Sequence, residues 1–173
     1  MILTSELPAV VLRKDLARSI RRGHPWIYRD AVVAPDGLQQ GSFVEVLTRD
    51  GRAIGRGFWD ARSPIAVRVL ESGGPGYRFT DSETLVMERL RASLQRRLTR
   101  LDLATTNAFR WVHGEADLLP GLHIDFYTDT AVVRFDGEGA REFYQPLEPK
   151  LQAAADGMLI SSCLPAASAN RLG

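Results

Sequence analysis

Cysteine, lysine and long apolar runs are scarce in this chain of 173 residues. The single cysteine, Cys163, excludes an internal disulfide framework and a zinc site built from several cysteines. No uncharged apolar run approaches the roughly 20 residues that span a bilayer. Glu6 and Pro8 interrupt any apolar stretch before Arg13, so the start of the chain lacks the layout of a signal peptide. These absences predict a cytoplasmic protein.

Lysine is rare because arginine supplies 20 of the 22 basic side chains. Residues 1–72 carry 11 Lys and Arg against 8 Asp and Glu, whereas residues 104–173 carry 5 against 9. The net charge of +1 therefore hides a basic front and an acidic back. A guanidinium group binds phosphate with a planar fork and stacks on bases, so the basic front suits RNA. A general preference for arginine over lysine would explain the same bias without RNA.

The first 72 residues predict a small β-barrel with one short helix. The helix is expected over 15–23, with Leu16 and Ile20 facing inward and Gly23 at its end. Asp50-Gly51 marks a hairpin turn. Strand patterns occur at 9–12, 43–47, 53–59 and 65–70.

The remainder predicts a partial α/β unit after a breaker cluster at 72–76. A long helix is expected from Thr80/Asp81 to about Leu101, with a stripe of leucines at 90, 94, 98 and 101. Strands are expected at 109–113, 122–127 and 131–135, followed by a helix over 140–155 that Pro146 and Pro149 interrupt.

The predicted class is therefore α+β: a small barrel, a long helix, and a β-hairpin with a further helix, without a complete Rossmann-like domain. The expected divisions are a first domain at 1–72, a linker at 73–79, a middle domain at 80–156 and a tail of uncertain order at 157–173.

Cations and rings are concentrated near the front of the chain. Single-stranded RNA is bound by cations on its phosphates and by rings that stack on its bases. The alternative is a solvated helix face followed by a tryptophan in the core. The candidate RNA-binding residues are Lys14, Arg18, Arg21, Arg22, His24, Trp26, Tyr28 and Arg29.

Two other patterns have a structural and a chemical interpretation. The Gly-rich run at 69–76 lies between a strand and a helix, where it could cradle S-adenosylmethionine, but its compressed glycine spacing favours a linker. A cluster of His113, Glu115, Asp117 and His123 could serve a small metal-dependent enzyme, or form a polar turn network. A third function class is a protein-interaction remnant that binds neither RNA nor metal.

Cys163 is the only candidate nucleophile of its type. Its neighbours supply no evident base, so a small residue on a buried strand or in a loose tail is the structural alternative.

Three ordered blocks resemble one family, the PUA-containing ribosomal RNA methyltransferases. Residues 21–28, RRGHPWIY, are similar to its RRxHPW[VI][FY] segment. The strands between residues 41 and 69 are similar to those of its PUA domain. Residues 109–125, FRWVHGEADLLPGLHID, resemble its block around the motif ESDGLPGL, with Leu118 in place of the usual glycine.

This resemblance implies an N-terminal portion that binds large-subunit ribosomal RNA, in a family whose members methylate cytosine C5 with S-adenosylmethionine. It implies that the family's cofactor-binding domain is missing and that the chain, as a truncated or frameshifted product, is not catalytic alone. The segment 157–163 is similar to a late family segment that carries a cysteine nucleophile, which makes Cys163 the tentative catalytic residue. Further partners implied are a second copy or a separate methyltransferase domain.

Overall fold

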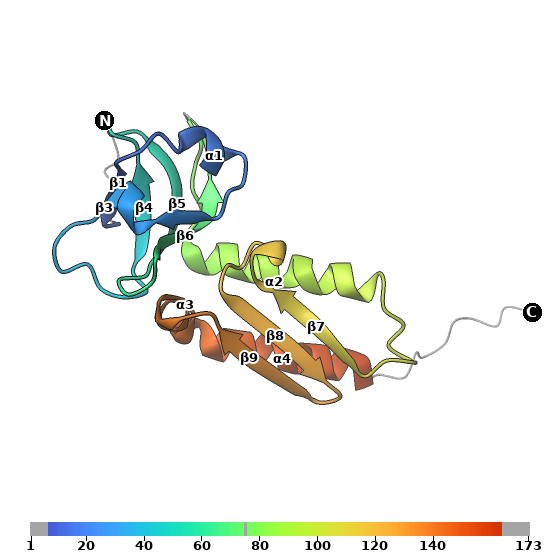
Figure 1. The fold of residues 1–173 in the computed structure, drawn as a ribbon. Coiled ribbons are helices and arrows are strands. Elements are labelled where there is room, and N and C mark those ends of the chain that lie inside the picture. The colour runs from blue at the N-terminus through green and yellow to red at the C-terminus, as the bar shows by residue number, and fades with distance from the viewer. Residues whose placement is uncertain (1–6, 75, 164–173) are drawn as a thin grey trace, which may run out of the picture.

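The computed structural model describes residues 7–74 and 76–163, which form two adjoining units (Figure 1). The first unit is built almost entirely of strands. Its elements are β1 (Ala9–Leu12), α1 (Ala17–Arg21), β2 (Trp26–Tyr28), η1 (Arg29–Ala31), β3 (Val32–Val33), β4 (Phe43–Leu47), β5 (Ala53–Trp59) and β6 (Ile65–Ser72).

The six strands of this unit form one sheet in the order β2-β6-β5-β4-β1-β3. The β1–β4 pair is parallel, and the other neighbouring pairs are antiparallel. The predicted hairpin turn joins β4 to β5, and Gly51 has a φ of +79° there. The sheet curls into a nearly closed barrel, as the alternating short strands predict (Figure 1).

The barrel interior is filled with aliphatic side chains. Val10, Ile27, Val44 and Val46 are all 0% exposed. Each such side chain stabilises the fold by about 1.5–3 kcal/mol relative to exposure. Ile20 of α1 packs into the same cluster, so the short helix is fixed to the barrel through its apolar face.

The second unit has a three-stranded sheet with helices packed on it. The sheet order is β7-β8-β9, and both pairs are antiparallel. Asp81 caps the long helix by accepting a 2.8 Å hydrogen bond from the Thr84 N–H. The elements are α2 (Ser82–Leu98), β7 (Ala108–His113), η2 (Gly114–Asp117), β8 (Leu122–Tyr127), β9 (Thr130–Phe135), α3 (Glu138–Tyr144), η3 (Gln145–Leu147) and α4 (Glu148–Cys163).

The buried face of α2 differs from the predicted leucine stripe. Leu85, Val86, Leu90 and Ser93 are buried, whereas Leu98 is 39% exposed. In the last turn the side chain that contacts β7 is Arg97, whose Nε donates a 3.1 Å hydrogen bond to the Arg110 carbonyl. The stripe is therefore confirmed at Leu90 and Leu94 but wrong at Leu98, and α2 ends at that residue rather than at about Leu101.

The interruption predicted in the last helix is confirmed. Pro146 lies in η3, a short 3₁₀ helix that separates α3 from α4. Pro149 follows in the first turn of α4. Helix α4 then continues to Cys163, across the expected start of the tail at residue 157.

The core of the second unit includes Phe58 and Leu70 of the barrel, so the two units are packed together through it. Phe58 of β5 is 0% exposed and stacks on Phe143 of α3, with ring centroids 4.8 Å apart. Gly41 has a φ of +75°, and a Cβ there would lie 2.5 Å from the Glu142 Cβ. Asp60 reaches the same helix by accepting a 3.3 Å hydrogen bond from the Gly139 N–H. These contacts hold the barrel and the second sheet in one arrangement.

The architecture is thus mixed α/β with a nearly closed β-barrel, in agreement with the barrel expected from the sequence. Within the described ranges, none of the helices has the length and apolarity needed to cross a membrane.

Candidate nucleic-acid interface

Helix α1 presents three arginines to solvent. Ala17 and Ile20 are buried against the barrel, so Arg18, Arg21 and Arg22 face outward. In the described part of the chain none of these three guanidinium groups has an ion-pair partner. The chain leaves the helix through Gly23, whose φ is +93°, and reaches the exposed His24. The expected basic face is therefore present.

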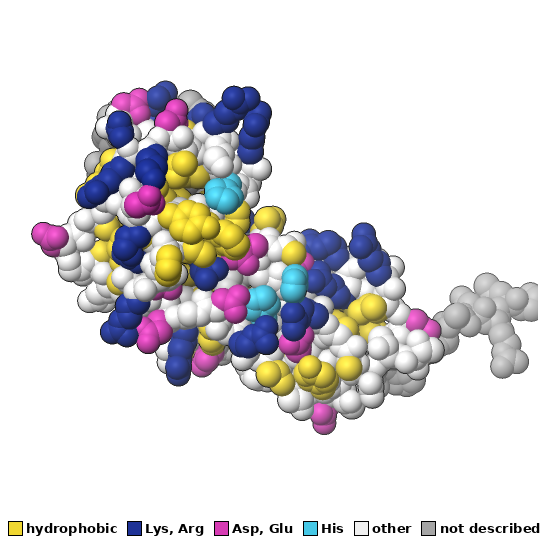
Figure 2. Space-filling model, viewed as in Figure 1, with side chains coloured by type: hydrophobic (Ala, Val, Ile, Leu, Met, Phe, Trp, Pro, Cys, Tyr) yellow, Lys and Arg dark blue, Asp and Glu magenta, His cyan; other side chains and the backbone are white. Residues whose placement is uncertain are grey.

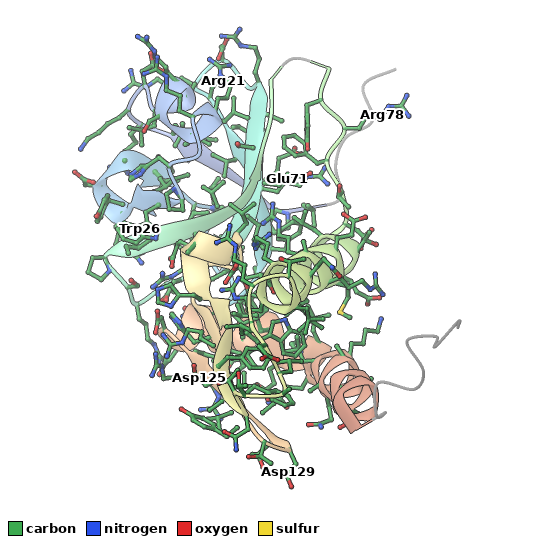
Figure 3. The ribbon with its side chains drawn as sticks, turned by 90° about the vertical axis from the view of Figure 1, so that its right-hand side faces the viewer. Arg21, Trp26, Glu71, Arg78, Asp125 and Asp129 are labelled. Atoms are coloured by element: carbon green, nitrogen blue, oxygen red, sulfur yellow. The ribbon has the colours of Figure 1, made fainter. Side chains whose placement is uncertain are left out.

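Strand β2 places the two aromatic candidates differently. It pairs with β6, and a register shift follows Ile27, which is fully buried. Tyr28 is 47% exposed. Trp26 is half-buried, and its Nε1–H donates a 2.9 Å hydrogen bond to Glu115 Oε1 of the second unit. Figure 3 shows Arg21 at the far end of the barrel and Trp26 at the end nearest the second sheet.

Two of the candidate cations have structural partners. Lys14 Nζ lies 2.5 Å from Asp30 Oδ2, and this hydrogen bond and charge lower the pKa of the Asp30 carboxyl. Arg29 donates through Nη2 to the Ser63 carbonyl at 2.7 Å and stacks 5.1 Å from the Trp59 ring. Their charges are therefore less available to a ligand than those of α1.

Sequence reasoning missed a buried ion pair at the junction. Arg68 of β6 is 9% exposed, and its Nη1 donates a 2.9 Å hydrogen bond to Glu115 Oε1. The same oxygen receives the Trp26 indole, so Glu115 connects two barrel strands to η2. The charged residues are 47 positions apart in the chain, and no local pattern signals such a contact.

The polar cluster proposed for a metal-dependent enzyme is divided among other partners. Glu115 binds Arg68, while Asp117 binds Arg96 and Arg97. His123 Nε2 lies 2.8 Å from Asp136 Oδ2. Among the side chains that the structure describes, those of 7–74 and 76–156, His, Cys, Asp and Glu form no group of three able to hold a metal ion. The geometry corresponds to the polar turn network.

The Gly-rich run also has a structural role. Glu71 is 5% exposed and accepts hydrogen bonds from the Tyr77 hydroxyl at 2.9 Å and the Thr80 N–H at 3.0 Å. A Cβ on Gly73 would lie 2.3 Å from the Tyr77 ring. Glu71 and Gly73 therefore stabilise the segment that connects β6 to α2 (Figure 3). These contacts agree with the linker interpretation of the run.

Cys163 is the last residue of α4, and its side chain lies outside the described side chains. The backbone at this position belongs to the helix that begins at Glu148, not to the strand that was one alternative.

The comparisons with known proteins agree with the barrel and with its position in the chain. A family model described as a PUA-like domain matches residues 10–72. Ribosomal RNA large subunit methyltransferase I from Alteromonas mediterranea is 34% identical over 138 residues, which is 77% of this chain and 33% of that protein. The protein of the same name from Tolumonas auensis is 32% identical over 144 residues, 83% of this chain and 36% of that one. The chain thus spans about a third of the curated relatives it matches.

Solved structures share the fold. A protein from Streptococcus mutans, described as a SAM-dependent methyltransferase, aligns with a TM-score of 0.66 at 14% identity. That alignment covers 91% of this chain and 39% of the other. The chain therefore contains a PUA-like domain and is homologous to ribosomal RNA large subunit methyltransferase I, as the resemblance implied.

Proposed function

We propose that this chain is the RNA-recognition part of a methyltransferase that uses S-adenosylmethionine to methylate cytosine C5 in large-subunit ribosomal RNA. The observation that carries the proposal is the exposed cationic face of α1 on a PUA-like domain. The names of the relatives support the RNA class. Cytosine and its C5 atom rest on the family resemblance of the three sequence blocks.

The same proposal assigns parts of the chain to roles. Residues 1–72 form the RNA-binding domain, residues 73–79 the connection and residues 80–156 the middle domain. Methyl transfer is assigned to regions of the relatives that the matched third does not cover. The engaged carboxylate of Glu71 supports this division, because the run around it offers no free acid to a cofactor.

RNA would bind by charge and stacking. Arg18, Arg21 and Arg22 would neutralise successive phosphates, with displacement of counterions as the main driving force. The exposed rings of His24 and Tyr28 would stack on unpaired bases. Trp26 would hold the barrel edge in place through Glu115 rather than contact RNA with its indole N–H.

The test is charge reversal on α1. R21E/R22E should lower affinity for a single-stranded fragment of large-subunit ribosomal RNA by about tenfold at 0.1 M salt, and reduce the slope of log K against log salt by about 1.4. Fluorescence anisotropy over a salt series measures both quantities.

The matched control is R91E/R141E, which makes the same charge change at two exposed arginines on α2 and α3 of the second unit. Equal affinities and equal salt slopes for the two double variants would refute binding by α1.

A further inference from the structure

A second cationic surface lies on the other unit, in a groove between the end of α2 and β7. The groove has a volume of about 530 Å³. Its cationic and aromatic lining consists of Arg96, Arg97, Arg100, Phe109, Arg110 and His113. Figure 2 shows Lys and Arg side chains gathered over this region, on the same face as the histidines.

Positive charge exceeds negative charge in the groove. Asp117 is the carboxylate of its lining, and its side chain is only 2% exposed beneath Arg96 and Arg97. Arg110 pairs with Asp125 at 2.7 Å, yet 37% of its side chain stays exposed. Arg100 is exposed and has no ion pair with any residue of the described ranges. Four guanidinium groups thus face two carboxylates.

The buried carboxylate fixes the orientation of the cations. Asp117 accepts hydrogen bonds of 2.6 Å from both Nη1 and Nη2 of Arg97, and one of 2.7 Å from Arg96 Nη2. Arg96 remains 47% exposed at the side chain, so its other N–H donors face solvent. Arginines held in this way lose less side-chain entropy when they bind an anion.

The groove also offers an apolar wall. Phe109 is partly buried and stacks on Phe126, with ring centroids 5.7 Å apart. A guanidinium fork binds phosphate and carboxylate alike, but an aromatic ring beside it adds a stacking surface for an unpaired base, which an acidic protein segment does not supply.

The groove is connected to the barrel through one 3₁₀ turn. In η2, Glu115 accepts from Trp26 of the barrel, while Asp117 orients the arginines of the groove. His113 lies in the groove, and its ring is 5.6 Å from that of His123. Turn η2 therefore contacts the barrel with one carboxylate and the groove with the other.

We infer that the groove between α2 and β7 binds the phosphodiester backbone of single-stranded RNA, as a second contact beyond the α1 surface. The inference rests on the proposed function for its ligand class and extends that function to the second unit. Its residues are distinct from those of α1, so the two surfaces can be tested separately.

The experiment measures the binding of a 20-nucleotide single-stranded RNA to the full chain. R96E/R100E should lower affinity for a 20-nucleotide RNA by about tenfold and reduce its salt slope by about 1.4, because two phosphate contacts are lost. R91E/R141E is the control with equal charge change, and it places one reversal on α2 at a residue outside the groove lining. R100E alone tests the site without disturbing the ion pair to Asp117, and should give about half the change in slope.

The outcomes separate the two proposals. If R96E/R100E binds as R91E/R141E does while R21E/R22E binds weakly, the groove inference is overturned and the α1 surface stands. If the reverse holds, α1 is refuted and the groove stands. An acidic peptide of equal charge serves as a competitor. If it displaces the labelled 20-nucleotide RNA as efficiently as unlabelled RNA does, the assignment to RNA is overturned. Absence of RNA binding by the unaltered chain would refute both.

Discussion

Glu115 and Asp117 show how two residues of one turn serve two surfaces. Both lie in η2, where Glu115 contacts the barrel and Asp117 contacts α2. In the sequence they appear as one acidic cluster beside two histidines, which suggested a metal site. Their partners, Arg68 and Arg97, come from distant elements, so the sequence alone cannot distinguish ligands from ion-pair partners.

Trp26 is expected to stabilise the fold through its indole N–H. W26F keeps most of the ring but removes the bond to Glu115, and should cost about 1 kcal/mol of unfolding free energy. RNA affinity should stay within about twofold, since that bond does not face a ligand. Urea denaturation and anisotropy measure the two quantities.

The control for this prediction is a double-mutant cycle with E115A, which removes the acceptor. The loss in W26F/E115A should be smaller than the sum of the single losses, because each change alone already breaks the same hydrogen bond. Strict additivity would contradict the contact.

Asp117 is expected to make stability depend on pH. Burial raises the pKa of its carboxyl, but hydrogen bonds from Arg97 and Arg96 outweigh burial and the net pKa lies below its ordinary value. A carboxyl with a lowered folded-state pKa stabilises the fold above its unfolded pKa of about 3.9, and that contribution is lost as the pH falls through the folded value. D117N should therefore cost about 2 kcal/mol at pH 7, and less as the pH falls from about 4 toward 2.

Urea midpoints measured from pH 7 to pH 2 test this difference. D129N, which changes an exposed carboxylate in the turn between β8 and β9, serves as the control and should leave the pH profile unchanged. Parallel profiles for D117N and the unaltered protein would exclude a role for this carboxyl in acid sensitivity.

At the scale of elements, the sequence predicted the longer strands well. Bounds of 43–47 and 53–59 agree with β4 and β5, because continuous or alternating apolar residues end there at turn signals. Strands β2 and β3 have three and two residues, too few to show any period, and they exist through pairing with β6 and β1. Helix α2 has leucines on two faces, and only tertiary contacts decide which is buried.

Gly41 is expected to control the docking of α3 on the barrel. G41A would combine an unfavourable φ of +75° with a contact of 2.7 Å between the new Cβ and the Phe143 backbone nitrogen. Because that backbone cannot move freely, the variant should lose about 2 kcal/mol or more of unfolding free energy.

G51A provides the matched control. Gly51 has a similar φ of +79°, but no atom lies within 4 Å of the position of its Cβ. It should lose only the cost of the backbone conformation, about 1 kcal/mol. Urea denaturation measures both losses of unfolding free energy. Equal losses in the two variants would show that the close approach of α3 contributes nothing to the loss in G41A.

At the scale of the whole molecule, the sequence predicted two parts but not their junction. The breaker cluster at 72–76 and the change of pattern after it indicated a division. Phe58 and Leu70 look like ordinary barrel residues in the sequence, yet both belong to the core of the second unit. The α1 surface was predictable because its arginines are close in the sequence, whereas the groove required α2 and β7 to come together.

The stacked rings of Phe58 and Phe143 have a consequence for cooperativity. Neither unit can open without exposing aromatic surface that the other covers, so the barrel and the second sheet should melt in a single transition. Amide protons in the central strands of both sheets should then exchange with solvent through the same global opening. An RNA strand that contacted only one unit would stabilise both units equally, because ligand binding to the native state lowers the population of every unfolded form.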